Sequence, residues 1–239
     1  EFNKKLQKET FGIVLTAHPT FGMTHQIMIN LAKLATNKNE KGKKISDSEL
    51  KSIIKDIFKT EQKPEKNISL DFEHELSIIA LQNLQYALGS FFKIVVNVTK
   101  EIFPNEYFDI MPQIFRLHTW VGYDVDGRGD IFWNDTFSKR LIVKIDQLKI
   151  YYEGIKKNKS LSKNKFIYEK LNSLLKVVSN AIKYNSKILK AFSGKEFINE
   201  VFEIKEISRF MYKNKDSLLT NKKVLIRPIE ELVEILKVS

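Results

Sequence analysis

Two short segments carry the residue types from which a catalytic site can be built. In the first, His18 follows an apolar run at residues 11–17 and stands directly before Pro19. An imidazole titrates near neutral pH and therefore suits general acid–base catalysis. A lone histidine in this position is more often a core side chain that hydrogen-bonds a backbone carbonyl. The first segment alone leaves both interpretations open.

The second segment is a loop rich in glycine and aspartate, at residues 124–130. Glycine permits a tight backbone turn and the close approach of a ligand. Asp124 and Asp126 are of the type that holds a divalent cation or orients an arginine. An EF-hand loop needs glycine at its sixth position, whereas Gly127 comes fourth, so that calcium site is excluded. The simple alternative is a tight turn between a strand and a helix.

A predicted strand precedes each segment. Residues 11–17 are apolar and rich in β-formers, and the residue before a proline is disfavoured in a helix, so this strand should end at His18. Residues 115–123 form the second predicted strand. Two strands about a hundred residues apart form a stable sheet only if they pair. The pattern therefore predicts a sheet or barrel whose other strands lie elsewhere.

The rest of the chain is predicted to be helical. Ser46 and Glu49 have capping-box spacing, which predicts a helix over residues 47–59. A helix following the Gly/Asp-rich loop should be capped by Asn134 or Asp135. The other predicted helices span residues 21–35, 71–103, 163–191, 195–214 and 228–238, the last with Pro228 in its first turn.

The two segments together resemble the signatures of one enzyme family. VLTAHPT, at residues 14–20, is similar to the segment that carries the catalytic histidine of phosphoenolpyruvate carboxylases. TWVGYDVDGRG, at residues 119–129, resembles the second signature of that family, which is close to SWMGGDRDGNP. The order of the motifs agrees, as does the long predicted helix between them. The resemblance covers about residues 11–152 and identifies the chain as a divergent member.

The resemblance implies a mostly α-helical fold that contains part of a (β/α)₈ barrel, with two barrel strands and long helices. Residues 1–239 are then a single region, the amino-terminal part of a carboxylase-like domain, and the catalytic carboxyl-terminal half lies outside them. The chain alone is expected to be inactive. The whole enzyme is expected to be a cytoplasmic homotetramer.

The implied reaction joins phosphoenolpyruvate and bicarbonate to give oxaloacetate and phosphate, with Mg²⁺ or Mn²⁺ bound by the other half. Such an enzyme is a lyase that fixes carbon dioxide and feeds the tricarboxylic acid cycle. By resemblance His18 is the general base at the carboxyphosphate stage. The residues expected to bind substrate are Thr20, Trp120, Asp124, Asp126 and Arg128, and no metal ligand is predicted among them.

Several positions depart from the family pattern. Val125 stands where the family has an arginine that binds substrate phosphate. The acidic residue and arginine pair that usually follow His-Pro-Thr are absent from residues 21–26. We hypothesise that Arg128, three residues beyond Val125, makes the missing phosphate contact. The alternative is a non-catalytic helical homologue with a binding or regulatory role.

Composition excludes other classes. The 239 residues are 43% hydrophobic and include no cysteine, which excludes a disordered chain, a disulfide scaffold and a thiol nucleophile. The net charge of +11 raises the possibility of a nucleic-acid-binding helical module. The lysines are spread along predicted helices, which favours a solvated surface and no nucleic-acid partner. Polar side chains interrupt the charge-free run at 76–92, so no membrane span is predicted.

His74, between two glutamates, is expected at the surface.

Overall fold

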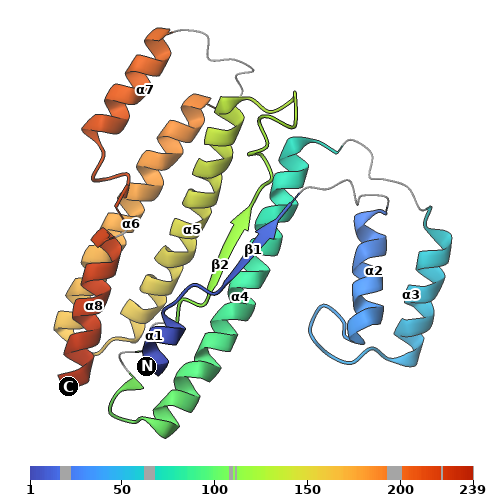
Figure 1. Cartoon of the computed structure of the whole chain (residues 1–239), viewed down its shortest axis with the longest axis horizontal. Helices are drawn as coiled ribbons and strands as arrows, with labels where there is room; N and C mark the ends of the chain where they lie inside the picture. The colour runs from blue at the N-terminus through green and yellow to red at the C-terminus, as the bar shows by residue number, and fades with distance from the viewer. Residues whose placement is uncertain are drawn as a thin grey trace. The chain divides into compact units, whose positions relative to one another are not determined.

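The computed structural model describes residues 1–16, 23–61, 68–107, 110, 112–192, 201–221 and 223–238. The fold is mostly helical and includes two parallel strands, as expected (Figure 1). In chain order the elements are α1 (Phe2–Leu6), β1 (Phe11–Leu15), α2 (His25–Thr36), α3 (Asp47–Lys59), α4 (Leu70–Ile102), β2 (Phe115–Thr119), α5 (Trp133–Leu161), α6 (Lys165–Phe192), α7 (Val201–Lys213) and α8 (Lys223–Val238).

β1 and β2 form a two-stranded sheet with each other. The backbone N–H of Phe11 donates to the carbonyl of Ile114 at 3.0 Å, and the N–H of Trp120 donates to Leu15 at 2.7 Å. Parallel neighbours require a long crossover connection, which α2, α3 and α4 supply here. Further barrel strands are not among the residues that the structure describes.

The predicted strands are longer than the observed ones. β1 ends at Leu15, and the predicted end at residues 17 and 18 lies outside the described residues. β2 ends at Thr119 instead of residue 123. Gly122 has a φ of +85°, in the left-handed region, which is incompatible with an extended strand.

The chain divides into two compact units. The first contains residues 1–13, 82–117 and 122–239, and the second contains residues 14–81 and 118–121. Both strands and α4 therefore pass from one unit into the other.

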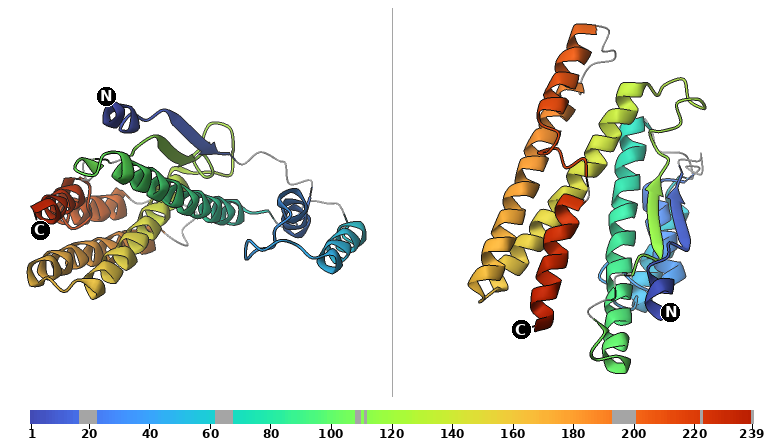
Figure 2. Two further views of the ribbon diagram at one scale, coloured as in Figure 1. Left: turned by 90° about the horizontal axis from the view of Figure 1, so that it is seen from below. Right: turned by 60° about the vertical axis from the view of Figure 1, so that its left-hand side comes forward.

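The core of the first unit lies along the helix pair α5 and α6, which run side by side in both views of Figure 2. One cluster of buried residues comprises Leu141, Ile188, Phe192 and Leu218. A second comprises Leu148, Val178 and Ala181, with Leu225 of α8 packed against it. The apolar faces of α5 and α6 thus form the base on which α7 and α8 pack.

The second unit contains the helical hairpin α2–α3. The capping box is confirmed, because Ser46 Oγ accepts from the N–H of Glu49 at 3.3 Å and Glu49 Oε2 accepts from the N–H of Ser46 at 2.9 Å. α3 spans residues 47–59 as predicted. α2 begins at His25, after an N-cap at Thr24, rather than at residue 21. Among the described helices, none is both long and apolar enough to cross a membrane.

Three further local predictions are wrong. The N-cap of α5 is Phe132 rather than Asn134 or Asp135, and Asp135 instead accepts the N–H of Phe132 at 3.0 Å. α8 starts at Lys223, whose N–H donates to the side chain of Asn221 at 3.0 Å, so Pro228 lies inside the helix. His74 is buried, with 3% of its surface exposed, rather than at the surface.

Candidate functional site

The first motif follows β1. Leu15, the last residue of this strand, stands three residues before His18. His18 and Thr20 themselves lie outside the described residues. Their predicted roles therefore stay predictions.

The second motif begins where β2 ends, and the sheet fixes its first residues. The N–H of Trp120 donates to Leu15, while Thr119 Oγ1 accepts from the N–H of Val121 at 3.1 Å. Val121 is buried, with 4% exposed, but the side chain of Trp120 is half-exposed. The backbone of the motif is therefore anchored next to β1, while about half of the Trp120 surface is open to solvent.

The turn at Gly122 is held against α5. A Cβ at this position would lie 2.9 Å from Cγ of Lys139, so only glycine fits between the turn and this buried lysine. Thr136 Oγ1 donates to the carbonyl of Gly122 at 2.9 Å. One turn of α5 thus fixes the direction in which the loop leaves β2. Sequence reasoning missed Lys139, because nothing separates it from the many other lysines on predicted helices.

Asp124 folds back over its own loop. Its carboxylate oxygens lie 2.6 and 2.7 Å from the position that a Cβ on Gly127 would take, and its carbonyl accepts the N–H of Arg128 at 3.1 Å. Glycine is needed at 127 because the carboxylate occupies that space. Asp126 is exposed on the same loop.

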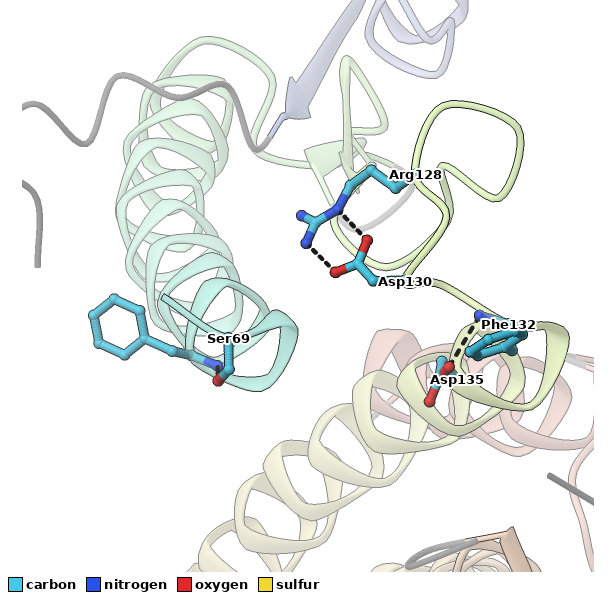
Figure 3. A network of polar contacts seen from close by, with 6 residues as sticks. Ser69, Arg128, Asp130, Phe132 and Asp135 are labelled. Carbon is cyan, nitrogen blue, oxygen red and sulfur yellow. Dashed lines mark hydrogen bonds and ion pairs between the residues drawn. The ribbon is translucent and has the colours of Figure 1, made fainter. Parts of the chain in front are cut away.

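Arg128 forms a two-pronged ion pair with Asp130 (Figure 3). Nε donates to Oδ1 at 2.9 Å and an Nη donates to Oδ2 at 2.6 Å. The hydrogen bond from Arg128 lowers the pKa of the Asp130 carboxyl, and its positive charge acts in the same direction. Asp130 was not among the predicted site residues. The Arg-Gly-Asp spacing was its only signal in the sequence.

The position of the missing family arginine is open to solvent. Half of the Val125 side chain is exposed. A second cation of the region, Arg140, lies over the ring of Tyr123 at 5.2 Å. Burial raises the pKa of the Tyr123 hydroxyl, and the charge of Arg140 opposes this shift. Stacked in this way, Arg140 supports the loop from the α5 side.

Two of the three loop carboxylates already have partners within the loop. Asp124 is turned onto Gly127, and Asp130 is engaged by Arg128. Within the described ranges, no three histidine, aspartate or glutamate side chains are grouped so that they could hold a metal ion. Asp124 and Asp130 are therefore both engaged within the loop itself.

One protein-family model matches most of the chain. The family model described as phosphoenolpyruvate carboxylase matches residues 1–223, well beyond the 11–152 covered by the sequence resemblance. No curated protein and no solved structure matches the chain. Because the model spans both motifs, both strands and most of the helices, the chain belongs to the phosphoenolpyruvate carboxylase family.

Proposed function

We propose that this chain supplies the amino-terminal motifs of an enzyme that carboxylates phosphoenolpyruvate with bicarbonate to oxaloacetate and phosphate. The observation that carries the proposal is the hydrogen bond from Trp120 to Leu15. It ties the start of the second motif to the strand that leads into the first. In barrels of parallel strands, catalytic groups gather where the strands end.

In the proposed reaction, His18 is the general base at the carboxyphosphate stage. An imidazole both accepts and returns a proton near neutral pH, as this role requires. Thr20 and Trp120 are proposed to contact substrate, and the half-exposed side chain of Trp120 is accessible for this contact. The family's metal ion enters no step assigned to the described residues.

Arg128 is proposed to bind the substrate phosphate. A guanidinium keeps its charge at any physiological pH and presents a planar fork to phosphate oxygens. Asp124 contributes by shaping the loop through its contact with Gly127. Asp126, exposed on that loop, is proposed to orient the bound substrate. In this proposal, Arg128 takes the role of the family arginine, whose position is occupied by Val125.

We further propose that residues 1–239 are one region at the amino-terminal end of a longer (β/α)₈ domain. An apolar groove of about 970 Å³ between α5, α6 and α8 supports this, because soluble proteins seldom leave such surface uncovered. Its walls include Tyr151, Leu161, Ile226 and Ile229, all substantially exposed. In the whole enzyme, further helices would cover this groove. We propose that the whole enzyme is a cytoplasmic tetramer and that its metal ligands lie in the remaining half of the protein.

Replacement of Arg128 in a longer protein that contains this chain tests the phosphate contact. Arg128→Ala should raise the KM for phosphoenolpyruvate about tenfold or more, since it removes a charged hydrogen bond to the substrate. Arg209→Ala, on the exposed face of α7, is the matched control and should leave KM unchanged. An unchanged KM in Arg128→Ala would refute the assignment.

A non-catalytic homologue is the second candidate. Val125 favours it, because a half-exposed apolar side chain stands at the position of a substrate-binding arginine. This candidate predicts that the longer protein forms no oxaloacetate, although it retains the scaffold of the family.

A further inference from the structure

We infer that the Asp130 carboxylate competes with the substrate anion for the guanidinium of Arg128. The Arg128–Asp130 pair must therefore open when phosphate enters. The inference rests on the proposed phosphate contact of Arg128 and extends it to a residue that sets the affinity of the site.

The geometry of the pair supports this role. Nε and one Nη of Arg128 point to the two oxygens of a single carboxylate, at 2.9 and 2.6 Å. This is the side-on arrangement in which a guanidinium also binds two phosphate oxygens. A phosphate on that edge of Arg128 would take the place of the Asp130 carboxylate.

The pair can open without disturbing the core. The side chains of Arg128 and Asp130 are 31% and 59% exposed. Gly129 stands between them, and a Cβ there would meet nothing within 4 Å. The displaced carboxylate therefore has water available as its new partner.

The Arg128–Asp130 pair is formed in the structure. The hydrogen bond from Arg128 lowers the pKa of Asp130 and so favours the ionised carboxylate that pairs with the guanidinium. An exposed ion pair contributes little free energy compared with a buried one, which suits a contact that yields to a dianion. The loop also leads directly into α5. The amino end of a long helix favours negative charge, which here applies to a bound phosphate as well as to the carboxylate.

Inorganic phosphate is the probe for the test, and the reporter is the Nε–Hε signal of Arg128 in NMR titrations of the chain. Asp130→Asn keeps the size of the side chain, while Asp130→Ala removes both acceptor oxygens. Both variants should bind phosphate about threefold more tightly or better than the unmodified chain. Arg128→Ala, followed through neighbouring amide signals, should abolish the binding.

Glu206→Gln is the matched control. Glu206 pairs with Arg209 at 2.9 Å on exposed α7, so this variant makes the same change in net charge at another arginine. It should leave phosphate binding at Arg128 unchanged.

The outcomes separate the two proposals. If Arg128→Ala abolishes binding but neither Asp130 variant tightens it, the competition is refuted and the phosphate contact stands. If phosphate binds equally well to Arg128→Ala, the contact and the competition both fail. Equal tightening by Glu206→Gln would attribute the gain to net charge and would also overturn the inference.

Discussion

The backbone N–H of Trp120 donates a hydrogen bond of 2.7 Å to the carbonyl of Leu15. These residues are 105 positions apart, yet each stands at the end of a strand that leads into a family motif. In the described part of the chain between them lie the helices α2, α3 and α4. The bond is therefore a tertiary contact that fixes the start of the second motif beside the end of β1.

The turn at Gly122 should not tolerate a side chain. Gly122→Ala places a Cβ in the left-handed region and 2.9 Å from Lys139 Cγ. The expected cost is about 1–2 kcal/mol from the backbone alone, measured by urea denaturation. Gly129→Ala is the control, because that site has open space and no left-handed φ. Equal stability of the two variants would contradict the described turn.

Val125→Arg should restore a phosphate-binding cation. Because half of the Val125 side chain is exposed, the longer arginine can extend into solvent without disturbing the core. Phosphate affinity should rise about tenfold, as expected for a new charged hydrogen bond, and calorimetric titration measures it. Val224→Arg, at a similarly exposed valine of α8, should have no effect. A gain in both variants would indicate nonspecific attraction.

The cap of α3 should weaken in acid. Hydrogen bonds from the backbone and side chain of Ser46 lower the pKa of Glu49 from its ordinary value of 4.5. The carboxylate therefore stabilises the folded state above pH ~5, and this contribution is lost as the pH falls through the folded pKa. Glu49→Gln should remove this part of the pH dependence, measured by urea unfolding at several pH values. Glu75→Gln, at an exposed position of α4, is the control. An unaltered pH profile in Glu49→Gln would refute the cap's role.

The α5–α6 core should be sensitive to truncation. Ile188 is 2% exposed and belongs to the cluster with Leu141 and Phe192. Ile188→Ala should cost about 2–5 kcal/mol, since it removes buried methyl groups and leaves a cavity. Ile150→Ala, at a 41% exposed position, should cost less than about 1 kcal/mol. Thermal and urea denaturation measure both, and similar losses would contradict the described core.

Local signals in the sequence predicted local structure well. The bounds of α3 were predicted correctly because Ser46 and Glu49 bond each other's backbone N–H groups within three residues, a contact that depends on local sequence. The end of β2 was not predicted correctly, because the turn at Gly122 packs on Lys139, which is seventeen residues further along the chain. His74 stands between two glutamates, a pattern typical of surface positions, yet it is buried by tertiary packing.

The candidate site was predicted in part. The motif residues were recognisable by type and order, because a family signature is a local pattern. The pairing of Arg128 with Asp130 was missed, since residues two apart meet only when the loop between them turns back. The fold of Asp124 over Gly127 was likewise a property of the loop conformation, which the sequence does not specify.

The most direct test is a carboxylation assay of a longer protein that contains this chain, with phosphoenolpyruvate, bicarbonate and Mg²⁺, and with oxaloacetate measured by coupled reduction. We predict that oxaloacetate forms and that His18→Ala lowers kcat by about 10²–10⁴-fold, the range for loss of a general base. Failure to form oxaloacetate, or a His18→Ala variant as active as the unmodified protein, would contradict the proposed function.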